Sequence, residues 1–228
     1  MLDIIYKDRD IAVCIKPVGY LSEEDGNKKS MPKAIKEALG VKDVFTVHRL
    51  DKNVSGVMVF ALNSRAASGL ARQIQEKAVK KEYLAVVNGV PKEEKGSMFD
   101  LLFRDASKNK TYVVDRERKG VRDASLDYEL LSTEDARSLV RVDLHTGRTH
   151  QIRVQFASRG MSLVGDGRYG SGDGKDEPAL FSYKLSFFHP INKKKMTFTS
   201  FPTTEGAFEL LSEDIIEKLG EQTCRSEK

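Results

Sequence analysis

The stretch VHRLDKNVSGVMVFAL, residues 47–62, changes character halfway along. Its first six residues include four polar or charged side chains, those of His48, Arg49, Asp51 and Lys52. From Gly56 onwards the residues are apolar, which indicates a buried strand. A solvated loop does not require such a cluster, and an apolar core excludes one. The cluster is therefore a candidate functional site, although Asp51 taken alone is typical of a turn or a helix cap.

The composition is typical of a soluble globular protein, with 39% hydrophobic and 32% charged residues. A chain of 228 residues can bury a substantial core, and we expect a single domain over residues 1–228. No apolar run is long enough to span a bilayer, and the first residues lack the features of a signal peptide. The two cysteines, Cys14 and Cys224, cannot build a disulfide framework. We therefore expect a cytoplasmic protein, monomeric and without a membrane partner.

The charge is distributed unevenly along the chain. The net charge is +4, but residues 203–228, an expected acidic helix and tail, hold seven acidic and three basic residues. Residues 104–122 hold seven basic and three acidic residues. This basic segment suits a polyanionic partner. On charge alone, a solvated loop explains it equally well.

Apolar periodicity and turn residues predict more strands than helices. The expected strands cover two segments around a turn at residues 7–10, then VFTVH, residues 57–62, EYLAVVNG, and segments near 98–103, 110–114, 124–131, 138–144, 180–188 and 194–201. The expected helices run from Pro32 to Gly40, from Asn63 or Ser64 to about Ala78, through TGRTHQIRVQFASRG with Gly160 as its C-cap, and around 205–219. Because strands often follow one another directly, the pattern favours an α+β fold with a largely antiparallel sheet.

Several common catalytic templates are unsupported. GDGRYG, residues 165–170, has the glycine spacing of a dinucleotide fingerprint, but a loop and not a helix follows it. We expect a turn-rich loop there. The four histidines are scattered and no HExxH or CxxC pattern occurs, so no metal site is expected. No G-x-S-x-G elbow indicates a serine hydrolase.

Two segments together carry a resemblance to a known family. HRLDKNVSG (48–56) resembles the HRLDxxTSG signature of the RluA-type RNA pseudouridine synthases, and TGRTHQIR (146–153) is a full match to a second motif of that family. Further similar motifs are the opening strands with their K-P-x-G turn at 16–19, K-x-Y at 81–83 and GD-x-x-YG at 165–170. The resemblance covers roughly residues 2 to 200 in order. It implies the pseudouridine synthase fold, with a central active-site cleft, and a catalytic domain without the small N-terminal S4-like module of some relatives.

Three positions depart from the family pattern. Val54 replaces a threonine after HRLD, and Leu126 stands where A-x-T-x-Y has threonine. These two changes are expected to affect packing. Phe181-Ser182 stands where the family usually has Leu-His, near the expected base pocket.

The resemblance implies isomerisation of uridine to pseudouridine in tRNA or ribosomal RNA, without a cofactor. Asp51 is then the catalytic carboxylate, which either attacks C1′ or removes a proton from C2′, and it must be ionised in both roles. Arg153 is its implied partner, since a guanidinium keeps a carboxylate ionised and oriented. Tyr83 is the implied stacking platform for the flipped base, although a strand tyrosine is more often a core residue.

A larger set of basic residues is expected to contact RNA. Arg148 is placed near a helix start, where backbone N–H groups bind phosphate, and Arg49 is equally well explained as a surface arginine. The full set is His48, Arg49, Lys81, Arg148, His150, Lys108, Lys110, Arg116 and Lys119.

Two other classes of function remain as alternatives. An RNA-binding or ribosome-assembly factor without catalysis is one, which the intact Asp51, Tyr83 and Arg153 disfavour. A glycosidase or nucleosidase is the other, but such enzymes usually pair two carboxylates and only Asp51 stands out.

Overall fold

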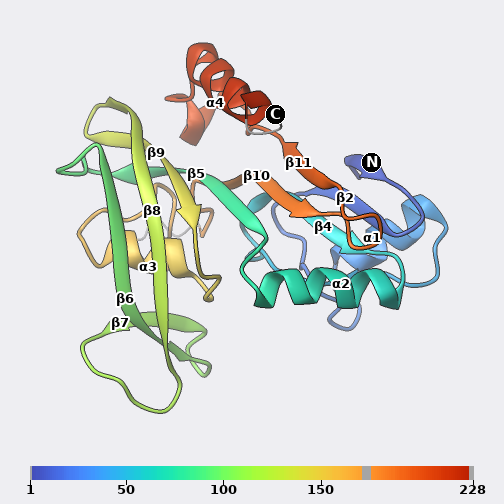
Figure 1. The fold of residues 1–228 in the computed structure, drawn as a ribbon. Helices are drawn as coiled ribbons and strands as arrows, with labels where there is room; N and C mark the ends of the chain where they lie inside the picture. The colour runs from blue at the N-terminus through green and yellow to red at the C-terminus, as the bar shows by residue number, and fades with distance from the viewer. Residues whose placement is uncertain (1, 171–175, 226–228) are drawn as a thin grey trace. The chain divides into compact units, whose positions relative to one another are not determined.

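The computed structural model describes residues 2–170 and 176–225, which form two compact units. The first unit comprises Met1–Lys81 and Ser182–Phe201, and the second comprises Glu82–Phe181 and Pro202–Lys228. Each unit contains strands and helices, so the α+β class predicted from the sequence is confirmed (Figure 1). The single-domain organisation stays a prediction.

The first unit is a sheet with helices packed on it. Its elements are β1 (Ile4–Lys7), β2 (Ile11–Lys16), α1 (Met31–Leu39), β3 (Phe45–Thr46), β4 (Ser55–Ala61), α2 (Ser64–Gln75), most of β10 (Leu180–Phe188) and β11 (Lys195–Thr199). The strand order is β1-β2-β4-β10, with β3 paired to β4 and β11 paired to β10. β1 pairs antiparallel with β2, β2 with β4, and β10 with β11.

Helix α2 closes the core of this unit, as its sequence predicts. Asn63 caps the helix, because its side-chain oxygen accepts from the backbone N–H of Ala66 at 2.9 Å. Leu70 and Ala66 pack against strand residues such as Val57 and Val59. The buried Gln73 exchanges two hydrogen bonds with the backbone of Phe188, which joins the helix to β10.

A tight contact fixes the start of β4. Gly56 has φ +126°, and a Cβ at this position would lie 2.3 Å from the carbonyl oxygen of Ser182. Only glycine fits such a position. Packing therefore requires the glycine of this motif, because β4 meets the backbone of β10 at Gly56.

The second unit is an antiparallel sheet with α3 on one face. Its elements are β5 (Lys80–Asn88, from Glu82 on), β6 (Lys95–Asp105), β7 (Lys110–Val114), β8 (Val121–Glu134), β9 (Arg137–Leu144), α3 (Gln151–Ala157), a 3₁₀ turn (Gly206–Phe208) and α4 (Glu213–Arg225). The strand order is β5-β9-β8-β6-β7, and each neighbouring pair is antiparallel. Val154 of α3 packs on Leu102 and Ala124, and Phe156 meets Tyr128 edge-on.

Three helix predictions were wrong in their bounds. The helix expected to run to about Ala78 ends at Gln75. The helix expected through TGRTHQIRVQFASRG begins only at Gln151, because His150 has a left-handed backbone (φ 56°) that a helix cannot continue through. It ends at Ala157 with Ser158 as the C-cap, so Gly160 belongs to the following turn. The last helix, expected around 205–219, divides into the 3₁₀ turn and α4, with the buried Leu210 and Leu211 between them.

No helix in the described part of the chain combines the length and apolar character needed to cross a membrane.

Candidate active site

The loop that carries Asp51 joins β3 to β4 in the first unit. Its side chains alternate: His48, Leu50 and Val54 are buried, Arg49 is exposed, and Asp51 is partly buried. The backbone turns tightly after Asp51, since Val54 N–H donates to the Asp51 carbonyl at 3.1 Å. The loop is thus anchored by alternate side chains, and Asp51 lies between two of the anchors.

The ammonium group of Lys16 anchors the same loop from inside. Lys16 is fully buried at the end of β2 and donates to the carbonyl oxygens of Val54 at 2.7 Å, Lys52 at 3.0 Å and Pro17 at 3.1 Å. A lysine has three N–H donors, and all three are used here. Gly19 N–H also donates to Lys52 O at 2.9 Å, so the K-P-x-G turn and the Asp51 loop form one bonded structure.

Burial lowers the pKa of Lys16 from 10.5 to about 8, and the negative charge of Asp51 opposes the shift. The amine therefore lies close enough to Asp51 for their charges to interact. Sequence reasoning used Lys16 only as part of a turn motif and missed its place beneath the site. A lysine directly after the apolar run IAVCI was the available signal.

His48 and Ser22 fasten the other side of the loop. Val59 N–H donates to His48 Nε2 at 3.1 Å, and Ser22 Oγ both accepts from Leu50 N–H and donates to Leu50 O. Burial and the nearby charge of Lys81 lower the pKa of His48 to about 3, so the imidazole is neutral. His48 was predicted to contact RNA. Its side chain instead lies in the interior, where it ties the loop to β4.

Arg49 and Lys81 differ in exposure. Arg49 is exposed and forms a surface ion pair with Glu23 at 3.0 Å, an interaction that a phosphate group can replace at small cost. Lys81 is half-buried, and burial lowers its pKa.

Arg153 lies on α3 in the second unit. It is 2% exposed, and its guanidinium grips Asp166 with two hydrogen bonds, Nε to Oδ2 at 2.7 Å and Nη2 to Oδ1 at 2.6 Å. Nη2 also donates to Asp176. Burial alone would raise the pKa of Asp166, but the hydrogen bonds and charge of Arg153, with two backbone N–H groups, lower it overall. The G-D of GDGRYG therefore supplies the carboxylate that orients Arg153, and the loop around it is rich in turns, as the sequence predicts.

Tyr169 of the same loop packs beside Arg153. The guanidinium carbon lies 5.3 Å from the ring centroid, and the Lys110 ammonium lies 5.1 Å from it. The Tyr169 hydroxyl bonds to His150 Nδ1 at 2.9 Å and accepts from Thr111 N–H at 2.8 Å. His150 is buried and supports Tyr169 through this hydrogen bond, and its predicted contact with RNA stays a prediction.

The TGRTHQIR segment forms a closed loop of its own hydrogen bonds. Gln151 Oε1 accepts from the Thr146 hydroxyl and from Arg148 N–H, and its Nε2 donates to Ser125 O. Arg148 is exposed, and its Nε donates to the carbonyl of Asp123 at 2.9 Å. Since α3 starts after this loop, Arg148 lies outside the helix start where the sequence placed it.

Tyr83 lies on β5 opposite Val142 of β9 and is 4% exposed. Such burial is the state expected of a core residue. A stacking role needs one face of the ring to be uncovered when RNA binds.

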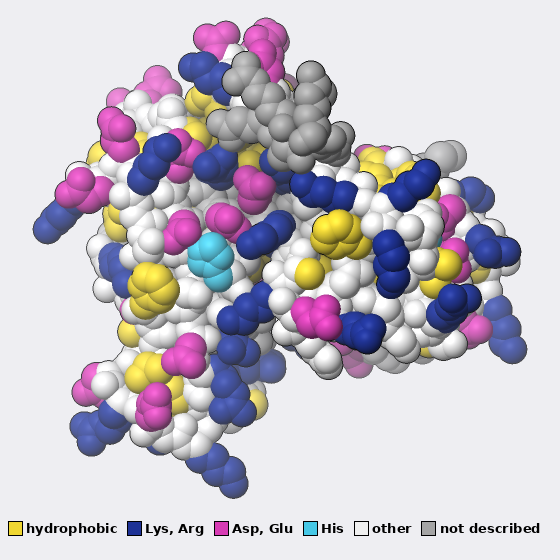
Figure 2. All heavy atoms as spheres, viewed as in Figure 1, with side chains coloured by type: hydrophobic (Ala, Val, Ile, Leu, Met, Phe, Trp, Pro, Cys, Tyr) yellow, Lys and Arg dark blue, Asp and Glu magenta, His cyan; other side chains and the backbone are white. Residues whose placement is uncertain are grey.

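The basic segment 104–122 is exposed around much of its length, and Figure 2 shows basic side chains gathered at the end of the second unit where β7 and the loop before β8 lie. Lys108, Arg116 and Lys119 are exposed, whereas Lys110 is half-buried against Tyr169. Arg168 holds the tip of the β6–β7 hairpin by donating to Asn109 O at 3.1 Å. The segment therefore consists of a hairpin, which Arg168 and Tyr169 hold in place, and an exposed basic loop after it.

One group in the described part of the chain has the spacing of metal ligands: Asp8, Asp10 and His189. Its atoms are already engaged. His189 Nε2 bonds to Asp8 at 2.8 Å, and Nδ1 accepts from the backbone N–H groups of Ile191 and Asn192. The arrangement joins the β1–β2 turn to the turn after β10.

The buried Lys16 generates a prediction for stability. Below pH 8 the folded state carries a charged, buried ammonium, whereas the unfolded chain keeps its proton up to pH 10.5. Lys16 therefore penalises folding most below pH 8, and the penalty falls as the pH rises towards 10.5. We expect the difference in unfolding free energy, wild type minus Lys16→Met, to rise by up to about 3 kcal/mol across this window. Urea unfolding at several pH values measures it, and a flat difference would show that Lys16 does not titrate there.

The comparisons with known proteins agree with this arrangement. A family model described as RNA pseudouridylate synthase matches residues 10–158, which include Asp51, Tyr83 and Arg153. An uncharacterized RNA pseudouridine synthase of Aquifex aeolicus is 35% identical over 218 residues, covering 86% of this chain and 68% of that protein. The tRNA pseudouridine synthase C of Haemophilus influenzae is 31% identical over 222 residues, covering 88% of this chain and 92% of that protein.

The fold has solved counterparts. Human RNA pseudouridylate synthase domain containing 1 superposes with a TM-score of 0.77 at 23% identity, over 96% of this chain and 94% of that one. Some curated relatives are longer: the chain spans 60% of the ribosomal large subunit pseudouridine synthase D of Neisseria meningitidis. The predicted pseudouridine synthase fold is confirmed, and the chain belongs to the RNA pseudouridylate synthase family.

Proposed function

We propose that this chain converts uridine to pseudouridine in tRNA or ribosomal RNA, with Asp51 as the catalytic carboxylate. The family match over residues 10–158 carries the proposal, because it includes the loop that the structure fastens on both sides of Asp51. The relatives named for tRNA and for the large ribosomal subunit support both classes of RNA. We also propose that the protein acts as a cytoplasmic monomer.

The reaction is an isomerisation, so it needs no redox partner. The bond between N1 of uracil and C1′ breaks, the base rotates, and C5 forms a new bond to C1′. The proton on C5 is lost and N1 gains one. Asp51 either attacks C1′ or takes a proton from C2′, and a carboxylate held by a bonded loop suits either role.

Arg153 is proposed to pair with Asp51, as the family pattern implies. Asp166 and Asp176 hold its guanidinium in one orientation, and Asp51 would be a third carboxylate beside it. Tyr83 is proposed to stack on the flipped uracil, which recovers roughly 1–3 kcal/mol of the cost of unstacking.

The RNA-binding surface is proposed to consist of exposed basic residues. Arg49, Arg148, Lys108, Arg116 and Lys119 are exposed and suit phosphate contacts. The half-buried Lys81 and Lys110 and the buried His48 and His150 are proposed to support this surface from beneath.

Nucleoside analysis tests the proposal directly. Purified protein is incubated with tRNA and ribosomal RNA transcribed in vitro, which contain uridine and no pseudouridine. Digestion and mass spectrometry then measure pseudouridine, and free uracil is measured in the supernatant. We expect pseudouridine at defined positions and no uracil. Uracil without pseudouridine would indicate a nucleosidase, and RNA binding without either product would indicate an RNA-binding factor.

Tyr83 is proposed to contribute a stacking face and a hydroxyl that helps to remove the proton from C5, and substitution separates the two. In Tyr83→Phe the stacking face is kept, so RNA affinity should stay close to wild type while turnover falls because the hydroxyl is lost. Tyr83→Ala should reduce both. Fluorescence anisotropy gives affinity, and single-turnover assays give the rate. Normal turnover by Tyr83→Phe would limit Tyr83 to a platform or a core residue.

A further inference from the structure

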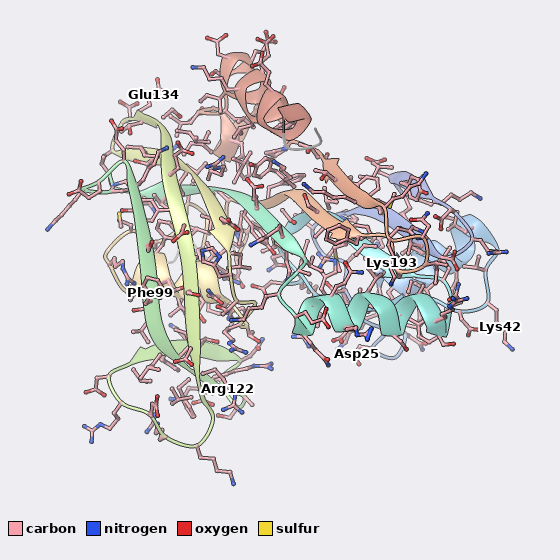
Figure 3. The ribbon with its side chains drawn as sticks, viewed as in Figure 1. Asp25, Lys42, Phe99, Arg122, Glu134 and Lys193 are labelled. Atoms are coloured by element: carbon pink, nitrogen blue, oxygen red, sulfur yellow. The ribbon has the colours of Figure 1, made fainter. Side chains whose placement is uncertain are left out.

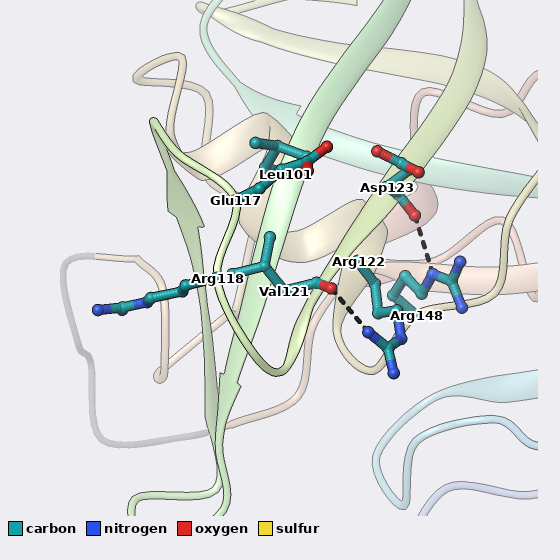
Figure 4. A pocket seen from close by; sticks show the side chains of 7 residues that line it. All are labelled: Leu101, Glu117, Arg118, Val121, Arg122, Asp123 and Arg148. Carbon is teal, nitrogen blue, oxygen red and sulfur yellow. Dashed lines mark hydrogen bonds between the residues drawn. The ribbon is translucent and has the colours of Figure 1, made fainter.

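A polar cavity of about 550 Å³ lies in the second unit. It is lined by Leu101, Glu117, Arg118, Val121, Arg122, Asp123 and Arg148 (Figure 4). All of these residues belong to the second unit, so the cavity is defined within one compact body. Figure 3 places Arg122 at the start of β8, with the exposed Phe99 on the neighbouring strand β6.

Two of the arginines are hydrogen-bonded to backbone carbonyls that lie two residues apart at the start of β8. Arg122 Nη1 donates to the carbonyl of Val121 at 3.0 Å, and Arg148 Nε donates to the carbonyl of Asp123 at 2.9 Å. Figure 4 shows both side chains extending to the same side of β8, while Arg118 points away. The Arg118 guanidinium instead lies over the ring of Phe103 at 4.6 Å.

Each backbone contact fixes a guanidinium and leaves most of its donors available. A guanidinium has five N–H donors, and these contacts use one from each arginine. Within residues 2–170 and 176–225, neither Arg122 nor Arg148 forms an ion pair. Two adjacent cations without a carboxylate partner are stabilised by an anion that bridges them.

The charges of the lining suit an anion of low charge. Glu117 and Asp123 also line the cavity, so the net charge of its lining is low: +1 with Arg118 included, whose guanidinium lies over Phe103. This balance favours a phosphodiester, which carries one negative charge, over a free phosphate dianion. The exposed basic loop beside it provides the wider attraction for a polyanion.

We propose that Arg122 and Arg148 form a clamp for a single backbone phosphate of the substrate RNA. The proposal rests on the proposed function, because the ligand is the RNA to be modified. The clamp lies at the start of β8 and in the loop before α3, so it fixes the RNA to the same loop that leads into the helix carrying Arg153. Its role is to set the register of the RNA and not to take part in the reaction.

Salt dependence of RNA binding tests whether the two arginines share one phosphate. The probe is an unmodified tRNA transcript, and affinity is measured by anisotropy from about 50 to 200 mM KCl. Each phosphate contact contributes about 0.7–0.9 to the slope of log K against log salt. We expect the slope to fall by about 0.7–0.9, the contribution of one phosphate contact, in Arg122→Gln, in Arg148→Gln and also in the double variant. Arg137→Gln, a surface ion-pair arginine of the same unit, should keep the full slope.

Losses that add up to two contacts in the double variant would mean separate phosphate sites, and unchanged slopes would remove both residues from the interface. Either result overturns the clamp. Because binding is measured without turnover, these outcomes remain informative even if wild type makes no pseudouridine.

Chemical substitution of the RNA tests the same claim from the other side. A synthetic stem-loop from a transcript that wild type modifies is prepared with one phosphate at a time replaced by neutral methylphosphonate. One replacement should weaken wild-type binding about tenfold, as expected for loss of a charged hydrogen-bonded contact. The same replacement should leave the affinity of Arg122→Gln/Arg148→Gln unchanged. If no position shows this loss of sensitivity in the double variant, the clamp is wrong. If no transcript is modified, the proposed function fails. The methylphosphonate series is then carried out with a tRNA stem-loop that wild type binds.

Discussion

The buried ammonium group of Lys16 is the constraint on which the proposed catalytic loop depends. Burying a charge costs several kcal/mol unless its hydrogen bonds are satisfied. Here three donors meet three carbonyl oxygens, two of them in the loop that carries Asp51. The same bonds that make the buried charge tolerable therefore fix the path of the loop. Asp51 then needs no rearrangement of its backbone to hold its position.

The second unit uses the same physical principle with a different pair of charges. Arg153 is buried, and Asp166 binds it with two hydrogen bonds. Removal of Arg153 would leave Asp166 as an uncompensated buried charge, so the pair is costly to break. Tyr169 packs beside the guanidinium and fastens the β6–β7 hairpin through Thr111. The orientation of Arg153 and the base of the basic segment are thus linked through one aromatic ring.

Local signals in the sequence predicted most of the elements. The strand after HRLDKNVSG, the Asn63 cap and the Gly40 end of α1 follow from patterns within a few residues, and the structure confirms each. The late start of α3 was not predicted: His150 has a left-handed backbone, and its side chain bonds to Tyr169, nineteen residues away.

For the candidate site too, local motifs predicted some residues, and contacts between distant segments determine the roles of others. Asp51 and Arg153 were identified through motifs, but the roles of Lys16 and Asp166 depend on contacts between distant segments. Residue type suggested that His48 and His150 contact RNA, but it could not reveal that both side chains are buried and hydrogen-bonded inside the fold. Charge counts alone could not separate Lys110, which packs on an aromatic ring, from the exposed Lys108.

The most direct measurement is release of tritium from RNA labelled at C5 of uridine, compared for wild type, Asp51→Asn and Asp25→Asn. Isomerisation must release the C5 hydrogen, and asparagine keeps the shape of aspartate without its charge. Asparagine also caps turns and helices nearly as well, so a purely structural Asp51 would tolerate the change. Asp25 is an exposed aspartate of the same unit, and Asp25→Asn should release tritium at the wild-type rate. The account predicts that Asp51→Asn binds RNA, unfolds at the wild-type urea concentration and releases no tritium. Substantial release by Asp51→Asn would contradict it.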